Sequence, residues 1–278
     1  MNKVFIIGLG LMGASYALKL SDTGHLVYGY DIDDAINKQA IKDKVIIDSD
    51  LSLLKEADLV IMCLYPHDII NFIKNNASLF KKGQLITDIS GTKEHLIKEL
   101  SNNLPEGVRY LSHHPMAGRE SKGYYNKDVT MFLNANFLIV ETNNYIPEDV
   151  KTLTDLAITL GFKNIQILSP VKHDELIGLT SQLTHLLAVS LMLTDNNEET
   201  KYATGDSFRD LTRIAKINES LWTELFLENK TSLSKVTDDF IKTLEKLKSL
   251  IDNDEKDKLI KKLKKAKEKR IEFDKVKN

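Results

Sequence analysis

The sequence predicts an α/β protein: a doubly wound parallel sheet followed by an all-helical domain. Two observations predict this class. Short apolar runs rich in β-branched residues alternate with helical patterns in the first part of the chain, and from His173 onward the apolar residues recur only at helical spacing. The pattern changes next to Pro170, so we place the domains at residues 1–168 and 169–278.

The expected elements follow one another in order. A run of β-branched residues such as 3–7 suits a strand buried on both faces of a parallel sheet. Helices are expected at residues 13–20 and 95–100, and Pro66 should end the third strand. The expected strands are residues 3–7, 25–31, 59–64, 84–88, 109–113 and 137–140.

Two segments of the helical part stand out. Residues 176–193 are apolar on more than one face, which predicts that part of this helix meets a second copy of the chain in a homodimer. Residues 238–273 form a charge-dense amphipathic pattern, expected to be a helical tail. Its lysines between 258 and 269 alternate with acidic residues, which indicates a solvated helix face rather than a basic patch.

Length and composition limit the class of protein. The 278 residues suit two domains, and 38 basic against 40 acidic side chains argue against a nucleic-acid binder. No window approaches about 18 uninterrupted apolar residues, so we expect no integral membrane protein. Glycines interrupt the apolar N-terminus, which argues against a signal peptide. The single cysteine, Cys63, fits a cytoplasmic protein without disulfides and, inside an apolar run, a buried hydrophobe.

The glycine motif GLGLMG at residues 8–13 lies between an expected strand and an expected helix. In that context it predicts a Rossmann-type dinucleotide site. Gly8 permits the tight turn, Gly10 lets a pyrophosphate approach the backbone, and Gly13 lets the helix pack on the strand. The residues expected to contact the cofactor are Gly8, Leu9, Gly10, Leu11, Met12 and Gly13. The alternative is a glycine turn that binds nothing.

Asp31 favours the cofactor site, because it ends the second strand where a carboxylate can accept hydrogen bonds from ribose hydroxyls. The same carboxylate would repel a 2′-phosphate. Ile32, Asp33 and Asp34 follow, with no arginine, so we predict NAD rather than NADP. We predict no metal site.

Three polar clusters are candidates for chemistry. In the first, consecutive His113 and His114 on a strand point to opposite faces, so one of them can face a given pocket. Pro115 and Gly118 predict a turn at the carboxyl end of this strand, where open α/β sheets bind ligands. The alternative is a pair of ordinary strand-end histidines.

The second cluster joins His173 and Asp174 to Ser181 and His185, which are one helical turn apart. Alone, it indicates a buried, hydrogen-bonded histidine. The third cluster is FRDLTRIA at residues 208–215, whose arginines make either structural ion pairs or a planar fork for a substrate carboxylate.

Together these motifs resemble the prephenate dehydrogenase family of tyrosine biosynthesis, which includes arogenate dehydrogenases. The resemblance implies an NAD-binding domain, a helical dimerisation domain, and oxidative decarboxylation of prephenate to 4-hydroxyphenylpyruvate. It covers nearly the whole chain and rests on GLGLMG at 8–13, TDISGTK at 87–93, HHPMAGRE at 113–120, HDELIGLTSQLTH at 173–185 and FRDLTRIA at 208–215.

The resemblance also implies roles for particular residues. His114 is similar to the family's catalytic acceptor of the ring-hydroxyl hydrogen, and Arg213 to the ligand of a substrate carboxylate. Either Ser90 or Thr92 supplies a catalytic hydroxyl, since serine and glycine are exchanged in this motif. The remaining residues implied at the substrate site are His185, Glu120, Asp174 and Gln182. Trp222 falls in a matching segment, where we expect it to pack.

Other functions stay open. The substrate is prephenate or arogenate, and the lack of an acidic residue within 181–185 favours prephenate, which has no ammonium group. A dehydrogenase of β-hydroxyacids or imines would need a lysine in the helical domain, for which Lys172 and Lys216 are candidates. An NAD-sensing regulator would bind the cofactor without turnover.

Overall fold

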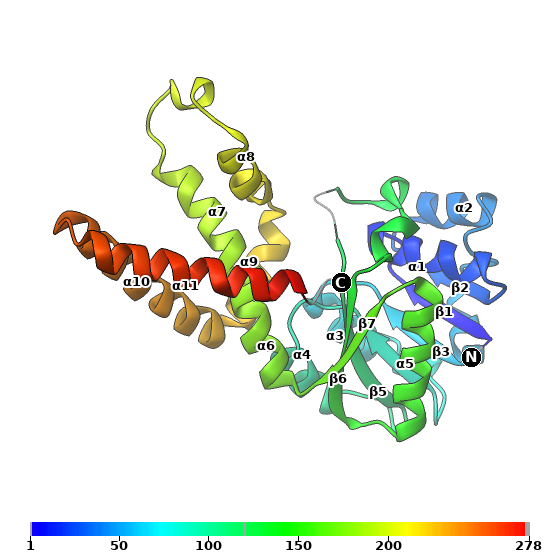
Figure 1. Cartoon of the computed structure of the whole chain (residues 1–278). Coiled ribbons are helices and arrows are strands. Elements are labelled where there is room, and N and C mark those ends of the chain that lie inside the picture. The colour runs from blue at the N-terminus through cyan, green and yellow to red at the C-terminus, as the bar shows by residue number, and fades with distance from the viewer. Residues whose placement is uncertain (1, 119–120, 276–278) are drawn as a thin grey trace. The chain divides into compact units, whose positions relative to one another are not determined.

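A seven-stranded sheet forms the centre of the first part of the chain (Figure 1). The structure is a computed structural model that describes residues 2–118 and 121–275. The strand order is β2-β1-β3-β4-β5-β6-β7, and the neighbouring pairs are parallel apart from β5 and β6. The strands are β1 (Lys3–Ile7), β2 (Leu26–Tyr30), β3 (Leu59–Met62), β4 (Leu85–Asp88), β5 (Arg109–Met116), β6 (Asn136–Asn144) and β7 (Asn164–Leu168).

Helices cover both faces of this sheet, as the predicted doubly wound class requires. Alternate residues of β1 belong to two separate apolar clusters: Val4 and Ile6 to one, Phe5 and Ile7 to the other. The first cluster includes residues of three helices, α1 (Leu11–Asp22), α2 (Asp34–Lys42) and α5 (Pro147–Leu160). The second includes residues of α3 (Pro66–Asn75) and α4 (Glu94–Ser101). The continuous apolar run therefore reflects burial on both faces.

The predicted turn at Pro115 is wrong, because β5 continues through this residue to Met116. Proline is tolerated there because β4 pairs with β5 only at Arg109 and Tyr110, which leaves the far half of β5 paired on the β6 side alone. The partner strand β6 runs antiparallel to β5, with His114 opposite Leu138, so the sheet is not wholly parallel.

The edge strand β7 is absent from the sequence-based expectation. Its five residues, NIQIL, are exposed or half-buried, so they lack the continuous apolar run of a central strand. Pairing with β6 along its whole length is what makes this segment a strand.

Among the residues described, the chain after Leu168 consists of helices and connecting loops and has no strand, as predicted. Helix α6 (Pro170–Ile177) leads through a π-helical turn, Gly178–Gln182, into α7 (Leu183–Thr194), and α8 (Asp206–Thr212) and α9 (Glu219–Glu228) follow. These helices and the sheet belong to one compact unit, Met1–Lys230.

A second compact unit, Thr231–Asn278, carries most of α10 (Lys230–Asp252) and all of α11 (Lys256–Lys275). The expected single helical tail at residues 238–273 is therefore two helices. The break includes Asp254, whose φ of 53° lies outside helical backbone.

The helical stretch Pro170–Thr194 is long and apolar enough, by length and composition, to cross a membrane. It is the one such helix among the residues described, and core helices of other proteins pass the same test. Within this stretch, Asp174 and Gln182 are buried and hydrogen-bonded to other segments of the same unit.

Candidate active site

The turn between β1 and α1 has the backbone that the glycine motif predicts. Gly8 has φ of 90°, and a Cβ there would lie 2.6 Å from the carbonyl oxygen of Cys63. A Cβ on Gly13 would lie 1.8 Å from the carbonyl oxygen of Gly8. A Cβ on Gly10 would meet no atom within 4 Å. Gly8 and Gly13 are thus required by the turn itself, whereas Gly10 leaves the start of α1 open.

The apolar residues of the motif direct their side chains into the protein. Leu9 and Leu11 are buried, and Met12 packs against the core cluster. What these residues offer a ligand is the backbone. The N–H groups of Leu11, Met12 and Gly13 occupy the first turn of α1, where no helical carbonyl precedes them and anions bind readily.

Asp31 lies directly after β2 and faces this turn. Its carboxylate accepts hydrogen bonds from the backbone N–H of Leu9 at 2.8 Å and of Asp33 at 3.0 Å. The side chain of Asn37 holds the backbone of Asp31 on both sides, with two bonds of 2.8 Å. A carboxylate has about four acceptor positions, so Asp31 can also accept from a diol. The sequence reading missed Asn37, which lies on α2 without a motif.

The two consecutive histidines of β5 have different environments, as the alternation of side chains along a strand predicts. The His113 ring is wholly buried and hydrogen-bonded to Thr87 at 2.7 Å and to the Tyr16 hydroxyl at 3.1 Å. Burial lowers the pKa of His113 to about 3. His113 is therefore a neutral core histidine, and His114 is the one that faces the helical segment.

His114 is half-buried and bonds to a second histidine. Its Nδ1 lies 2.9 Å from Nε2 of His173 on α6, and Nδ1 of His173 lies 2.7 Å from Asp174 Oδ1. Burial, together with the nearby His173 ring and Lys93 ammonium, holds the pKa of His114 well below its usual range. Burial also lowers the pKa of His173, although the Asp174 bond opposes this. Both rings are neutral near pH 7.

Asp174 also fastens α6 to the start of α4. Its carboxylate accepts from the backbone N–H of Lys93 at 3.0 Å and of Glu94 at 2.9 Å. Together with His173, these donors engage both carboxylate oxygens, and Asp174 is 2% exposed. Its acceptors are therefore used within the protein.

A buried ion pair lies beneath the carboxyl end of β4. Lys93 Nζ is 2.7 Å from Asp88 Oδ1 and 2.8 Å from the carbonyl oxygen of His113, so it fixes β5 next to His114. Burial alone would raise the pKa of Asp88, but the Lys93 ammonium, with hydroxyls from Ser112 and Tyr110, lowers it. The sequence analysis gave Lys93 no role, although Lys93 is the last residue of the TDISGTK motif at 87–93.

The two candidate hydroxyls on the loop after β4 are bonded differently. Thr92 donates its hydroxyl to Glu228 on α9, a carboxyl whose pKa burial raises. Ser90 Oγ accepts the Thr92 N–H at 3.4 Å. A Cβ on the intervening Gly91 would lie 3.3 Å from the side chain of Leu225. The Thr92 hydroxyl proton is engaged in the helical segment, so Ser90 is the better candidate for a catalytic hydroxyl.

Gln182 has a packing environment. It is 1% exposed, its Nε2 donates to the carbonyl oxygen of Leu225 at 2.9 Å, and its Oε1 accepts from Asn229 Nδ2 at 2.7 Å. Asn229 donates as well to the carbonyl oxygen of Asp174. The amide thus joins the π-helical turn to the end of α9. Contact between Gln182 and a substrate stays a prediction.

His185 stacks on Trp222 of α9, with ring centroids 3.7 Å apart, and Trp222 packs in turn against Phe226. Ser181 shares this face through its carbonyl oxygen, 2.9 Å from His185 Nδ1. Trp222 therefore packs, as expected.

Arg213 is exposed and begins the short helical turn Arg213–Ala215, which lies beside α7. Five residues later, Asn218 donates to the hydroxyl of Tyr65 at 2.9 Å, just past the carboxyl end of β3. The segment after Arg213 thus reaches the edge of the sheet that carries the glycine turn. Arg209 forms an ion pair with Asp206, the structural alternative foreseen for this cluster. That Arg213 and His114 meet one substrate stays a prediction, and Glu120 lies outside the described residues.

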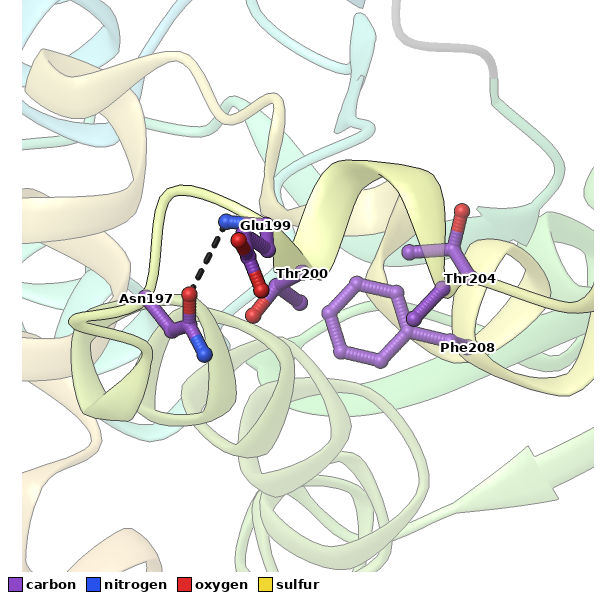
Figure 2. A pocket seen from close by; sticks show the side chains of 6 residues that line it. Asn197, Glu199, Thr200, Thr204 and Phe208 are labelled. Atoms are coloured by element: carbon purple, nitrogen blue, oxygen red, sulfur yellow. Dashed lines mark hydrogen bonds between the residues drawn. The ribbon is translucent and has the colours of Figure 1, made fainter.

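Two surface hollows lie elsewhere. One has a volume of about 260 Å³, and its lining residues are Asn197, Glu199, Thr200, Ala203, Thr204 and Phe208 (Figure 2). The other, of about 710 Å³, lies between α4, β6 and the start of α6. His114, Asp31 and Arg213 line neither hollow, so neither is the candidate site.

Comparison with known proteins covers both parts of the chain. The sequence model for "Prephenate dehydrogenase, nucleotide-binding domain" matches residues 14–166, and that for "Prephenate dehydrogenase, dimerization domain" matches residues 169–265. Prephenate dehydrogenase of Lactococcus lactis subsp. cremoris is 32% identical over 260 residues, which cover 89% of this chain and 70% of the relative. Cyclohexadienyl dehydrogenase of Zymomonas mobilis is 30% identical, covering 96% and 94%.

A solved structure agrees. Prephenate dehydrogenase of A. aeolicus, in complex with hydroxyphenyl propionate and NAD+, superimposes with a TM-score of 0.89 at 28% identity and covers 98% of both chains. The two family matches together span strands β2 to β7 and the helices as far as residue 265, and β1 and the glycine turn lie just ahead of the first match. On these sequence and structural grounds, the chain belongs to the prephenate dehydrogenase family.

Proposed function

We propose that this protein catalyses the NAD-dependent oxidative decarboxylation of prephenate to 4-hydroxyphenylpyruvate. The single observation that carries the proposal is His114: a neutral imidazole near the carboxyl edge of the sheet, bonded through Nδ1 to His173. In the residues described, its Nε2 has no hydrogen-bond partner. A neutral ring nitrogen is what a base needs in order to accept the proton of the substrate's ring hydroxyl.

The residues at the glycine turn fit NAD. The open space at Gly10 and the first N–H groups of α1 suit a pyrophosphate, and Asp31 suits a ribose diol. When bound, NAD supplies the hydride acceptor. The A. aeolicus relative was solved with NAD+, which supports the assignment.

His114, Ser90, His185 and Arg213 form the proposed substrate site. Arg213 supplies a guanidinium for a carboxylate, and Ser90 a hydroxyl beside the end of β4. His185 is held by the Trp222 ring. Asp174 and Gln182 act on the site through other residues, since their polar atoms already bind protein groups. Thr92 and Glu120 remain further candidates by resemblance.

The assay uses the purified protein with NAD and prephenate at neutral pH, followed by the absorbance of NADH. Appearance of NADH with prephenate supports the proposal, and reaction with arogenate alone would make the protein an arogenate dehydrogenase. If NADH formed only with a β-hydroxyacid, neither prephenate nor arogenate would be the substrate, and the proposal would be overturned. Binding of NAD without turnover of any of these would favour an NAD-sensing regulator.

We also propose a homodimer and retain the domain boundary at residues 168/169. The second matching family domain is described as a dimerization domain, and Leu179 and Leu193 of the long helix are exposed in the single chain. A monomer by light scattering at micromolar concentration would contradict the dimer. The cytoplasmic location stays a prediction from the single cysteine.

A further inference from the structure

We propose that His173 and Asp174 are positioning residues that determine which ring nitrogen of His114 carries the proton. The inference rests on the proposed function, in which His114 acts as the base. It is carried by a continuous hydrogen-bonded chain from α6 to β5: Asp174 Oδ1 to His173 Nδ1 at 2.7 Å, then His173 Nε2 to His114 Nδ1 at 2.9 Å.

The donor and acceptor of each hydrogen bond between Asp174, His173 and His114 follow from the environment of Asp174. The backbone N–H groups of Lys93 and Glu94 can only donate, so the Asp174 oxygens that face them accept. An accepting oxygen at Asp174 requires that His173 Nδ1 carries the proton. A neutral imidazole has one N–H, so His173 Nε2 must accept.

The consequence reaches the base in two steps. Because His173 Nε2 accepts, His114 Nδ1 must donate to it, and the lone pair of His114 then lies on Nε2. Nε2 is the ring nitrogen that is left for a substrate hydroxyl. Two backbone amides at the start of α4 thereby select the reactive tautomer of a histidine on another element.

A purely structural role for Asp174 would be to cap α4. That role explains its bonds to Lys93 and Glu94, but it would not depend on the protonation pattern of the two rings. His173 is 0% exposed and uses both ring nitrogens in the chain. The two explanations therefore differ in what they predict for a variant that keeps the cap and reverses the bond direction.

Asp174→Asn is such a variant. With the amide oxygen at the Oδ2 position, the variant keeps a bond from each backbone N–H, Glu94 at 2.9 Å and Lys93 at 3.3 Å, and its NH₂ group faces His173 at the loss of the 3.0 Å bond from Lys93. The opposite orientation would keep Lys93 alone and set NH₂ against the Glu94 N–H. His173 Nδ1 must then accept, His173 Nε2 donates to His114 Nδ1, and the His114 proton moves to Nε2. The base is blocked without removal of any ring.

The test reads the tautomer directly, by ¹⁵N NMR of histidine-labelled full-length protein near pH 7.5 without substrate. The His114 signals are assigned by their loss in His114→Gln. We expect the Nδ1–H form in the wild type and the Nε2–H form in Asp174→Asn. An Nε2–H form in the wild type overturns the proposal, even if the variant fails to fold.

Kinetics supply the second readout. We expect Asp174→Asn to lower kcat roughly 10²–10⁴-fold with little change in KM. The matched control is Asp149→Asn, which removes the charge of another buried carboxylate that binds a backbone N–H at a helix start, here that of α5. We expect wild-type kcat for the control. If Asp174→Asn has the kcat of the wild type, or if the His114 tautomer is unchanged in this variant, the positioning role is rejected and Asp174 only caps α4.

The NMR result needs no turnover, so it separates this proposal from the proposed function. If the wild type fails to oxidise prephenate but shows the expected tautomers, only the assigned substrate fails. If it is active but the tautomer is the other one, only the positioning role fails.

Discussion

Acid should weaken the folded state through His113, the buried neighbour of His114. The ring stacks on Phe137, with centroids 4.7 Å apart, and bonds to Tyr16 and Thr87. Burial lowers the pKa of His113 from 6.5 to about 3. Between these two pH values the unfolded chain binds a proton that the folded chain does not. The stabilisation is therefore complete above pH 6.5 and is lost as the pH falls toward 3.

The size of the effect follows from that interval. One pH unit of difference corresponds to about 1.36 kcal/mol, so the full interval gives an upper limit of about 5 kcal/mol. Between pH 7 and pH 5 the loss in the free energy of unfolding from His113 alone is about 2 kcal/mol.

The assay is urea unfolding at pH 7 and at pH 5, followed by the fluorescence of Trp222, the one tryptophan of the chain. The comparison protein is His113→Gln, which does not titrate in this range. Each protein is compared with itself at the two pH values, so a uniform loss of stability in the variant cancels. We expect the wild type to lose about 2 kcal/mol more than the variant. Equal losses would refute the reasoning.

Four further predictions concern the site. His114→Asn should lower kcat roughly 10²–10⁴-fold with a modest change in KM, and near wild-type turnover would remove His114 from the mechanism. Arg213→Ala should chiefly raise KM, with a loss of about 2–4 kcal/mol in binding; an unchanged KM would return Arg213 to a structural role. Fluorescence titration should show tighter binding of NADH than of NADPH, because the Asp31 carboxylate repels a 2′-phosphate; the reverse order would contradict the assigned cofactor. Finally, the kcat/KM profile should stay level as the pH falls through 6.5 and drop only below it, because burial, His173, Lys93 and His113 all hold the pKa of His114 low; a drop centred at or above pH 6.5 would contradict this.

The sequence predicted correctly those features that depend on residues close to one another along the chain. The turn at Gly8 needs positive φ, the contact at Gly13 excludes any side chain, and β1 needs apolar residues on both faces. Each requirement leaves a mark within a few residues. The opposite environments of His113 and His114 follow equally from the two-residue period of a strand.

Features that depend on residues far apart in the sequence could not be predicted, because neither segment carries a pattern that indicates its partner. The direction of β6 is decided by its pairing with β5, and β7 is a strand because β6 lies beside it. The bond between His114 and His173 joins residues 59 positions apart. Sequence reasoning put these two histidines in separate clusters and gave the pairing no weight, because nothing in either segment indicates the other.

The π-helical turn Gly178–Gln182 makes the long helix respond differently to the loss and to the gain of a residue. Successive residues of an α-helix are separated by roughly 100° of rotation, and the wider turn accommodates one residue that regular geometry would not. Deleting a single residue within the turn would therefore restore regular α-helix and leave His185 on the indole face of Trp222. Inserting a further residue would instead rotate every later side chain by about that angle relative to Asp174, so this segment can shorten by one residue more readily than it can lengthen.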